Sequence, residues 1–381
     1  MKIPKTIAVL FLLLALLIPL LRLSCSGKEE KVAAETPELF PDITTSAGLL
    51  SMRELGNGAV LVDVVNPWDT ATLLASYLLL DGEKRPDSVP PRQRLAELRV
   101  PLKRSAVFSA IHAGAIEELG ETGRVAAVAD AEYFKGAFAR GIADGSIADL
   151  GSSLSPSMEK ITLASPDAFL MYPMQNAGHG ALENSGIPII EMADYMETTP
   201  LGRAEWIRLL GRLYGRAAEA DSIFKSVESK YNTLAANASK LEKRPKVLTE
   251  MLTSGYWFVP GGNSYMARLI TDAGGEYPWA GDKSTGSLQL DFSAVYARAA
   301  DADIWLIKTY GSDLTLAGLR EVYPLNSQIK AFKKGGVYFA DTQKVTLYEE
   351  FPFHPELLLE EYAAIFSGNT DNLRYFKPVR Q

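Results

Sequence analysis

Short apolar runs alternate with amphipathic segments through the middle of the chain. The apolar runs lie at 105–110, 125–130, 167–173 and 187–195, and segments with helical spacing of apolar residues separate them. Continuous apolar strands between amphipathic helices are typical of a parallel sheet that is covered on both faces. We therefore predict an N-terminal α/β lobe over residues 102–198.

A second series of alternating strand and helix patterns begins near residue 245. Strand patterns occur at 246–252, 303–309 and 335–341, helical patterns separate them, and a last helix is predicted from Pro355 to Phe366. We assign residues 245–381 to a second α/β lobe.

One long helix is predicted between the two lobes. Thr199 is a suitable N-cap, Pro200 suits the first helical position, and apolar residues recur at helical spacing as far as Leu241. A helix of about 40 residues would be about 60 Å long. We predict that residues 199–244 form a backbone shared by both lobes.

The region before residue 102 has a different pattern. The stretches "AVLVDVVNPWD" and "ATLLASYLLL" alternate like strands, so residues 46–101 are predicted to form a β-rich entry segment. Residues 25–45 are mostly polar and are predicted to be a tether.

The N-terminus is typical of an exported lipoprotein. Two lysines precede an apolar run at 7–21, which is short for a spanning helix, for which about 20 residues are needed, and suits a secretory signal. Cys25 is the single cysteine of the chain and follows this run directly, although Arg22 stands where an aliphatic residue is usual. We predict a signal peptide over 1–24 and lipidation of Cys25; a free structural thiol and a plain cleaved signal remain alternatives.

Composition narrows the choice of partners. The chain of 381 residues is 47% hydrophobic and 22% charged, which is ordinary for a globular protein. Its formal net charge of −7 argues against a nucleic-acid partner, because phosphate binding needs a basic face. With one cysteine, the exported protein would contain no intramolecular disulfide. We expect a monomer.

Four segments resemble one known family. They are "MEKITLASPDAFLMY", "IPIIEMADYMETTPLGRAEWIRLLGRLYG", "VPGGNSYMARLITDAGGEYPW" and "FHPELLLEEYAAIF", within residues 102–376. They resemble the periplasmic substrate-binding proteins of ABC importers that have a helical backbone and carry ferric siderophores, haem or cobalamin. The entry segment resembles that of lipoprotein members from Bacteroidetes-type bacteria.

The resemblance implies two Rossmann-like lobes with parallel central sheets, joined by one long backbone helix, with a ligand cleft between them. In open α/β sheets, ligands bind beyond the carboxyl ends of the strands. The residues at these ends are the candidate ligand-binding residues: Ser109, His112, Tyr133, Tyr172, Met174, Gln175, Asn176, Tyr195, Tyr256, Trp257, Phe258, Trp279 and Tyr310. The same loops also carry Asp130, Glu132, Asp194, Met196, Glu197 and Lys308.

The stretch "TSGYWFVPGG" is predicted to be the loop after the first strand of the second lobe. Its aromatic residues Tyr256, Trp257 and Phe258 would then face the cleft. The alternative is that Trp257 and Phe258 pack beneath the loop.

The candidate loops favour a neutral ligand. They contain no arginine, whereas anionic siderophores and haem propionates are usually bound by arginine. Aromatic faces suit a large flat ligand, so cobalamin or a neutral ferric chelate is expected. Haem would need an axial ligand, for which the candidates are Tyr133, Tyr172, Tyr195, Tyr256 and His112. No resident cofactor or metal site is expected, because the chelate is the transported ligand.

The family resemblance also implies docking to an inner-membrane permease and its ATPase through one surface glutamate on each lobe. Glu159 stands at the matching place in the first lobe, but Ser293 occupies the place in the second, where Asp291 is the nearest substitute. A glutamate near a helix N-terminus is also favoured by the helix dipole alone. The expected location is the periplasmic side of the cell envelope, with the anchor at Cys25.

Two other functions remain as alternatives. A hydrolase is disfavoured because the chain has three histidines and lacks the HExxH, Gly-x-Ser-x-Gly and P-loop patterns; His179 in "NAGHG" has no evident partner in sequence. The other alternative is a surface-exposed lipoprotein that passes a corrinoid or haem to an outer-membrane receptor. The "KEE" at 28–30 resembles a surface-export signal, and a solvated tether would have the same composition.

Overall fold

The computed structural model describes residues 41–82 and 85–380. The predicted signal peptide, Cys25 and the predicted tether up to residue 40 lie outside this range. Among the residues that the structure describes, no helix combines the length and apolar character needed to span a bilayer.

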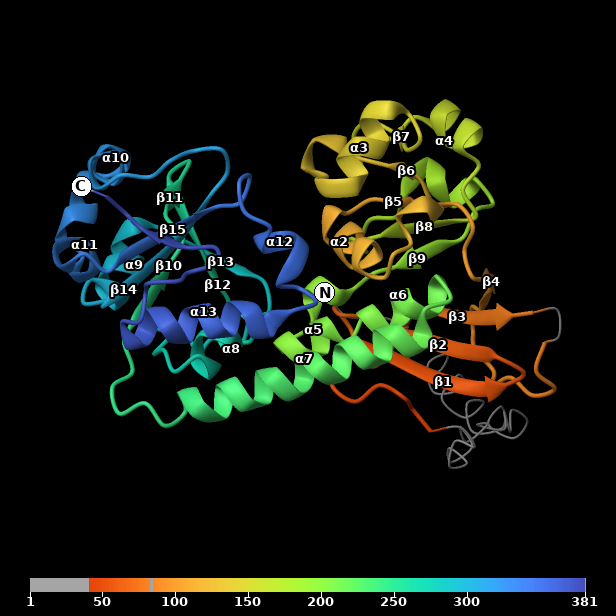
Figure 1. The fold of residues 1–381 in the computed structure, drawn as a ribbon, viewed down its shortest axis with the longest axis horizontal. Coiled ribbons are helices and arrows are strands. Elements are labelled where there is room, and N and C mark those ends of the chain that lie inside the picture. The colour runs from red at the N-terminus through yellow and green to blue at the C-terminus, as the bar shows by residue number, and fades with distance from the viewer. Residues whose placement is uncertain (1–40, 83–84, 381) are drawn as a thin grey trace, which may run out of the picture. The chain divides into compact units, whose positions relative to one another are not determined.

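The first lobe contains the predicted parallel sheet (Figure 1). Its five strands lie in the order β7-β6-β5-β8-β9, and every neighbouring pair is parallel. The strands are β5 (Ser105–Val107), β6 (Val125–Val128), β7 (Ala148–Asp149), β8 (Ala168–Met171) and β9 (Ile189–Glu191). The helices are α2 (Ala110–Glu118), α3 (Gly136–Asp144) and α4 (Met158–Ala164), with 3₁₀ turns at Thr122–Arg124, Ala131–Tyr133, Gly180–Asn184 and Asp194–Met196. Strand order reverses at β5, where such sheets bind ligands.

The entry segment forms a four-stranded sheet that extends the core of the first lobe. Its strands are β1 (Leu50–Gly56), β2 (Ala59–Val65), β3 (Leu73–Asp81) and β4 (Ala96–Val100), in that order, with only β3 and β4 parallel. Met52, Val62 and Tyr77 join the same buried cluster as the first lobe. The Tyr77 hydroxyl donates to the Ile189 carbonyl over 3.0 Å, which ties this sheet to β9.

The predicted continuous helix over 199–244 is wrong, because three helices occupy this region: α5 (Pro200–Ala204), α6 (Ile207–Leu213) and α7 (Ala217–Ala238). Thr199 caps α5 as predicted, accepting from the Gly202 amide over 3.0 Å. Gly215 ends α6 because it takes a left-handed φ of 75°, which a residue with a side chain rarely adopts. Gly211 lets α7 pack closely, since an added Cβ would lie 2.3 Å from that of Ala220.

The helix α7 nevertheless serves both lobes. It has 22 residues, or about 33 Å at 1.5 Å per residue. Phe224 and Val227 join the buried cluster of the first lobe, whereas Tyr231 joins that of the second. The shared backbone is therefore a 22-residue helix and two short ones.

The second lobe contains two sheets. In the larger, β10 (Val247–Thr249), β14 (Ile304–Thr309) and β15 (Val337–Asp341) are parallel, and β16 (Lys377–Pro378) is antiparallel to β15. The smaller is antiparallel, with strands β11 (Leu252–Thr253), β12 (Tyr256–Pro260) and β13 (Ser287–Leu290). The helices are α8 (Tyr265–Asp272), α9 (Phe292–Ala299), α10 (Leu316–Val322), α11 (Lys330–Lys334), α12 (Leu347–Glu350) and α13 (Pro355–Ser367), with a 3₁₀ turn at Pro324–Gln328.

The stretch predicted as an aromatic loop is the strand β12. Side chains alternate across a strand, so Trp257 and Val259 point into the lobe and are 0% exposed. Tyr256 and Phe258 point outward and are 48% and 43% exposed. The Trp257 indole N–H donates to the Thr249 carbonyl over 2.8 Å, and its ring stacks on Trp305.

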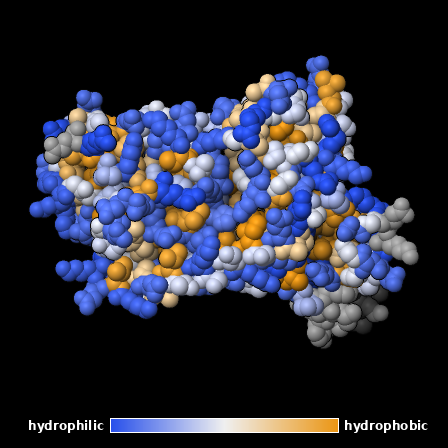
Figure 2. Space-filling view, viewed as in Figure 1, coloured by the Kyte–Doolittle hydropathy of each residue, from blue (hydrophilic) through white to orange (hydrophobic). Residues whose placement is uncertain are grey.

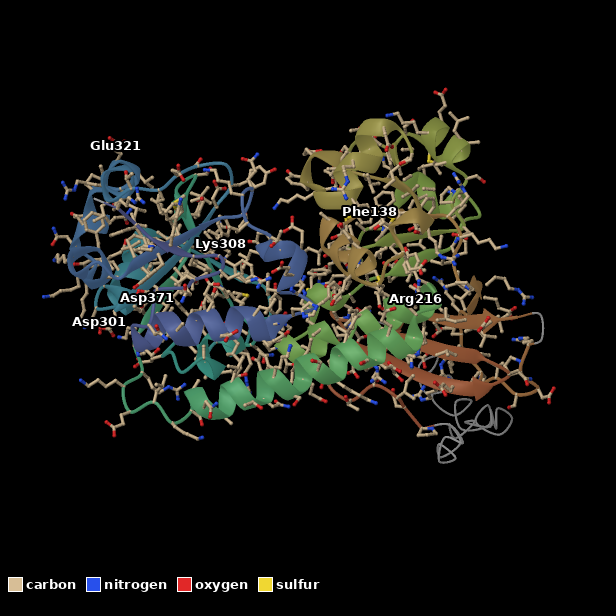
Figure 3. The ribbon with its side chains drawn as sticks, in the orientation of Figure 1. Phe138, Arg216, Asp301, Lys308, Glu321 and Asp371 are labelled. Atoms are coloured by element: carbon tan, nitrogen blue, oxygen red, sulfur yellow. The ribbon has the colours of Figure 1, made fainter. Side chains whose placement is uncertain are left out.

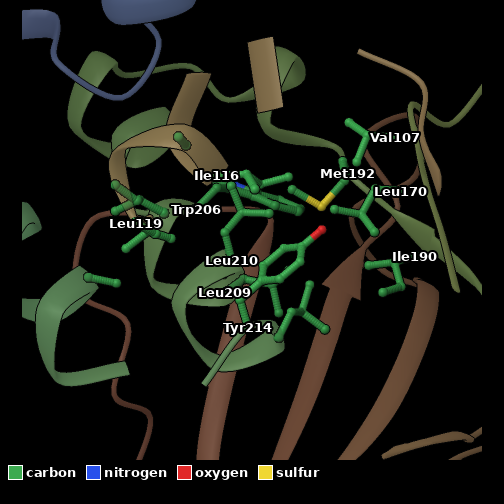
Figure 4. Close-up of a cluster of buried hydrophobic side chains, with 14 of the residues drawn as sticks. Val107, Ile116, Leu119, Leu170, Ile190, Met192, Trp206, Leu209, Leu210 and Tyr214 are labelled. Carbon is green, nitrogen blue, oxygen red and sulfur yellow. The ribbon is translucent and has the colours of Figure 1, made fainter. Parts of the chain in front are cut away.

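The linking helices are anchored in the core of the first lobe (Figure 4). Trp206 lies between α5 and α6, Leu209 and Leu210 lie in α6, and Tyr214 is the C-cap of α6. These side chains join a buried cluster with strand residues such as Leu170. The carboxylate of Glu205, 0% exposed, accepts the backbone amides of residues 45–47 over 2.7 to 3.0 Å. The chain that enters the fold is therefore fixed directly to the linking helices.

Helix α12 connects the second lobe to the first. Figure 1 shows it between the two lobes, and its contact with α2 is very close because Gly114 lacks a side chain: an added Cβ would lie 2.4 Å from the Glu349 carbonyl oxygen. His354, just after α12, contacts Glu118 of α2 through Nε2 over 2.8 Å and Glu356 of α13 through Nδ1 over 3.1 Å. One imidazole therefore joins carboxylates from both lobes.

Replacement of Trp257 by alanine should destabilise the protein strongly. The variant Trp257→Ala removes a fully buried indole and its hydrogen bond, and we expect the free energy of unfolding to fall by about 3–5 kcal/mol. Phe258→Ala, one residue along the same strand and 43% exposed, is the matched control and should cost less than about 1.5 kcal/mol. Urea unfolding measures both values, and equal losses would contradict this placement of the two side chains.

His354 should make stability fall as pH rises. Burial alone would lower the pKa of His354, but hydrogen bonds to Glu118 and Glu356 raise it to about 9. The folded protein then binds the proton more tightly than the unfolded chain, so the stabilisation is complete below about pH 6.5 and is lost as pH rises through about 9.

This dependence is measured against the variant His354→Asn. The difference in unfolding free energy between wild type and variant should be about 1–3 kcal/mol larger at pH 6 than at pH 9.5. Urea unfolding at both pH values gives the two differences. Equal differences would show that His354 is not charged between these carboxylates.

Candidate functional site

Two adjoining cavities lie at the carboxyl ends of the strands, where the two lobes face each other. The first, which we call the interlobe chamber, has a volume of about 390 Å³. Its lining comes from both lobes and includes Ser109, Asp130, Tyr133, Lys135, Tyr310, Thr342, Tyr348 and Glu349.

The second cavity, which we call the lobe-two chamber, has a volume of about 640 Å³. Most of its lining comes from the second lobe, and Tyr348 lines both chambers. The side chains are mainly aromatic, aliphatic or thioether, and include Tyr195, Met196, Glu250, Met251, Phe258, Tyr265, Met266, Lys308, Leu347, Phe351 and Tyr362. Lys308, labelled in Figure 3, projects from β14.

Two tyrosines meet across the interlobe chamber. Tyr133 follows β6 in the first lobe and Tyr310 follows β14 in the second, and each side chain is about half exposed. Their ring centroids are 5.9 Å apart in an edge-to-face arrangement. Aromatic surface from both lobes is therefore available to a ligand at the same place.

The lysine of the interlobe chamber is already satisfied by protein groups. Lys135 Nζ donates to the carbonyl oxygens of Thr342 and Val345 over 2.8 and 2.9 Å, and it pairs with Glu349 Oε1 over 2.8 Å. These bonds cross from the first lobe to the second. Lys135 therefore holds the segment before α12 against the first lobe.

A buried ionic cluster supports the residues that line the two chambers. Asp194 accepts from His112 Nε2 over 2.8 Å and from Arg203 Nε over 3.1 Å, and all three residues are buried. Burial alone would raise the pKa of Asp194, but His112 and Arg203 lower it below its ordinary value. The Arg203 guanidinium also lies 4.6 Å from the ring centre of Tyr265 and 5.6 Å from that of Phe351.

Several predicted ligand-binding residues belong to this supporting structure. His112 is 0% exposed and contacts Asp194, so its prediction as a cleft residue is wrong. The Tyr172 ring packs on His112 with centroids 4.8 Å apart, and its hydroxyl accepts from Ser109 over 3.0 Å. Ser109 also caps α2 and lines the interlobe chamber.

The predictions for Trp257 and Trp279 are also wrong. They are 0% and 4% exposed and belong to the core of the second lobe. Tyr256 is exposed but lines neither chamber, whereas Phe258 lines the lobe-two chamber.

The remaining predicted residues are divided between the chambers and an exposed turn. Tyr195 and Met196 line the lobe-two chamber, and the Tyr195 hydroxyl donates to the Pro173 carbonyl over 2.9 Å. The turn after β8 lines neither chamber and contains the exposed residues Met174, Gln175 and Asn176.

The segment around α12 also lines the chambers, although it was not predicted to do so from the sequence. Tyr348 lines both chambers, Glu349 lines the first, and Phe351 lines the second. The sequence signal was present as "TLYEEFPFH", in which aromatic and acidic residues cluster before the last helix. This segment does not directly follow a strand, so the rule that ligands bind at the carboxyl ends of strands did not point to it.

His179 has a partner that the sequence did not reveal. Its Nε2 lies 2.9 Å from Glu191 Oε1, at the end of β9. This hydrogen bond raises the pKa of His179, although burial opposes the shift. The pair fastens the turn after β8 to the sheet and lines neither chamber.

The predicted docking residues lie in different environments. Glu159 is exposed in the first turn of α4, and no ion pair to it occurs within residues 41–82 and 85–380. Its neighbour Lys160 is turned away and donates to the Asp149 carbonyl over 2.6 Å. In the second lobe Ser293 is exposed, but Asp291 caps α9 by accepting from the Ala294 amide over 2.7 Å.

Within the described part of the chain, no three His, Cys, Asp or Glu side chains come together in a way that could hold a metal ion.

Comparison with known proteins identifies the family. Residues 107–344 match the model of the periplasmic binding proteins. Two uncharacterised lipoproteins of Methanocaldococcus jannaschii are 30% and 25% identical over 254 and 255 residues, which are 63% and 62% of this chain. The chain spans 60% and 63% of the length of these two relatives.

Solved structures share the fold at low identity. A periplasmic haem-binding protein from Pseudomonas aeruginosa has a TM-score of 0.58 and 16% identity, and the alignment covers 74% of this chain and 99% of that one. An ABC-transporter substrate-binding protein from Listeria monocytogenes has a TM-score of 0.55 and 20% identity, covering 70% and 99%. A periplasmic vitamin B12-binding protein from Vibrio cholerae has a TM-score of 0.53 and 11% identity, covering 71% and 99%.

The α/β fold with parallel central sheets is thus confirmed, and the resemblance to substrate-binding proteins is confirmed with it. The likeness of the entry segment to Bacteroidetes-type lipoproteins stays a prediction. Because the family model matches more than half of the sequence, this chain belongs to the periplasmic binding protein family.

Proposed function

We propose that this protein is the substrate-binding component of an ABC importer and that it captures a neutral metal chelate, either a ferric siderophore-type complex or cobalamin. The observation that carries the proposal is that the lysines lining the two chambers are already paired with glutamates. Lys135 is paired with Glu349 and Lys308 with Glu250, and no arginine is among the described residues that line either chamber.

This charge arrangement disfavours an anionic ligand. A carboxylate or catecholate group would have to compete with Glu349 or Glu250 for a lysine that is already bound. The displaced glutamate would then lack its partner in a partly buried site, which is costly. A neutral chelate leaves both ion pairs intact, and its affinity comes from the apolar surface that it buries against the chamber walls.

The chamber walls support a large ligand with apolar faces. The volumes of about 390 and 640 Å³ lie in the range of small-molecule sites. Tyr133 and Tyr310 offer aromatic faces, and Met196, Met251 and Met266 can adapt their side chains to an irregular surface.

The proposal includes delivery to a membrane permease that docks mainly on the first lobe. Leu154 and Leu163 are 86% and 77% exposed, and Met158 is 37% exposed. All three are close in sequence to Glu159, which forms no ion pair with the other described residues. Residues of hydrophobic type are visible at the tip of the first lobe, at the position of α4 (Figure 2). Exposed apolar side chains beside an unpaired acid suit a protein partner with an apolar surface and a basic residue.

The second lobe provides a weaker docking surface in this proposal. Asp291 is engaged as the cap of α9, and the neighbouring Ser293 carries no charge. We further propose that a lipid on Cys25 holds the protein in the cell envelope, which agrees with the lipoprotein names of the two archaeal relatives.

Ligand capture is tested by equilibrium dialysis of the full-length protein in detergent. Cyanocobalamin and the ferric trihydroxamate ferrichrome are the neutral probes, and haemin and ferric citrate are the anionic ones. Saturable binding of a neutral probe is expected, and Tyr310→Ala should weaken it about 10-fold, because a half-exposed aromatic contact in the chamber is lost.

The matched control is Tyr296→Ala, which removes an exposed tyrosine of α9 outside both chambers and should leave the affinity unchanged. Preferential binding of haemin or ferric citrate would overturn the proposed ligand class. Absence of binding to all four probes would overturn the proposed chelate function.

Docking is tested with the double variant Leu154→Ser/Leu163→Ser and with Glu159→Gln. Each should weaken binding to permease-containing proteoliposomes about 10-fold or more, because apolar area or the acid is lost, while chelate affinity stays unchanged. Leu73→Ser, at an exposed leucine of β3, is the control. Docking that is insensitive to the lobe-one variants would refute the proposed docking surface.

A further inference from the structure

The lobe-two chamber contains one ion pair in a lining that is otherwise uncharged. Glu250 and Lys308 are the only charged residues among the described residues that line it. Their side chains are 23% and 17% exposed, so each has a surface open to the cavity. Lys308 Nζ contacts Glu250 Oε1 directly.

Both partners are held in place by the main chain. Glu250 directly follows β10 and adopts a left-handed φ of 61°, which is uncommon for a residue with a side chain. Its amide donates to the Leu306 carbonyl over 2.8 Å, and its carbonyl accepts from the Trp305 indole over 2.7 Å. Lys308 belongs to β14, the strand next to β10. Uncommon backbone conformations of this kind concentrate at ligand sites.

The pair has hydrogen-bonding capacity to spare. An ammonium group has three donors and a carboxylate has two oxygens, and the contact between Lys308 and Glu250 uses one of each. Within residues 41–82 and 85–380, Lys308 Nζ and Glu250 Oε2 have no other hydrogen-bond partner. Donors and an acceptor therefore stand side by side at the cavity wall.

The electrostatics of the pair select for neutral groups. Burial alone would lower the pKa of Lys308, but the Glu250 carboxylate raises it above its ordinary value, so the lysine stays charged. An anionic group would approach Lys308 against the charge of Glu250, and a cationic group would meet Lys308 itself. A neutral group that carries an acceptor beside a donor meets neither obstacle.

We propose that the Glu250–Lys308 pair is a recognition site for a carboxamide group on the ligand. The amide carbonyl accepts from Lys308 Nζ, and the amide N–H donates to Glu250 Oε2. Tyr348 lines both chambers, so one ligand can contact Tyr133 and Tyr310 in the first and reach the Glu250–Lys308 pair in the second with an amide-bearing arm. This inference rests on the proposed function, and it narrows the ligand to neutral chelates that carry peripheral amides.

The test compares cyanocobalamin with monocarboxylic derivatives in which one peripheral amide is replaced by a carboxylate. Binding to the full-length protein in detergent is measured by equilibrium dialysis. Wild type should bind at least one derivative about 10- to 100-fold more weakly than cyanocobalamin, because the new carboxylate meets Glu250. Glu250→Gln should reduce this discrimination to within about threefold.

Variants of Lys308 separate the loss of amide recognition from the effect of removing any paired lysine of the second lobe. Lys308→Met should weaken cyanocobalamin binding about 10- to 100-fold, and Lys308→Gln, which keeps a donor, should weaken it less. Lys246→Met is the matched control, because this lysine also pairs with an acid, Asp301, in the second lobe but outside both chambers. It should leave the affinity unchanged.

The outcomes distinguish this inference from the proposed function. If wild type binds cyanocobalamin and all derivatives equally, or if Lys308→Met binds like wild type, the amide site is refuted while chelate capture stands. If wild type binds neither cyanocobalamin nor ferrichrome, both are refuted. The comparison of derivatives uses wild type alone, so it decides the question even if a variant fails to fold.

Discussion

The arrangement of the two lobes depends on one buried cation. Arg203 lies in α5, the first of the linking helices; its guanidinium binds Asp194 of the first lobe and lies over the rings of Tyr265 and Phe351 from the second. Asp194 in turn holds His112, on which Tyr172 packs. Removal of the cation would leave a fully buried carboxylate with His112 as its remaining partner, which is costly in a region of low dielectric.

The candidate binding surface is built on this support. Tyr265 and Phe351, which face the guanidinium, also line the lobe-two chamber, and Lys135 fixes the segment before α12 from the first lobe. The charges near the chambers therefore serve mainly to position the walls. In the function that we propose, recognition is left to aromatic and thioether surface and to the spare hydrogen-bonding groups of the Glu250–Lys308 pair. This arrangement is the reason that we propose a large, neutral ligand.

Much of the fold could be predicted from sequence because it depends on local patterns. Apolar runs between amphipathic segments gave the parallel sheets, and Thr199 with Pro200 marked the start of α5. The break between α6 and α7 was missed because apolar spacing continues through it, and only the left-handed Gly215 turns the chain. The strand β12 was mistaken for a loop because Pro-Gly-Gly follows it, although its alternation buries Trp257 and exposes Phe258.

The site was less predictable because its key contacts join distant segments. His112 and Asp194 are 82 positions apart, and Lys135 reaches carbonyl groups more than 200 positions away. No local pattern shows that His112 is fully buried. Loops after strands did yield Tyr133, Tyr195 and Tyr310, since their place follows from topology. Tyr348 and Glu349 follow no predicted strand directly and were therefore missed.

The most direct test is a crystal structure of the protein with a bound cobalamin or ferric trihydroxamate, in which anomalous scattering locates the metal. The metal should lie in the interlobe chamber beside Tyr133 and Tyr310, with the contact between Arg203 and Asp194 intact. A metal found outside both chambers would contradict the assignment of the cleft between the lobes as the chelate-binding site.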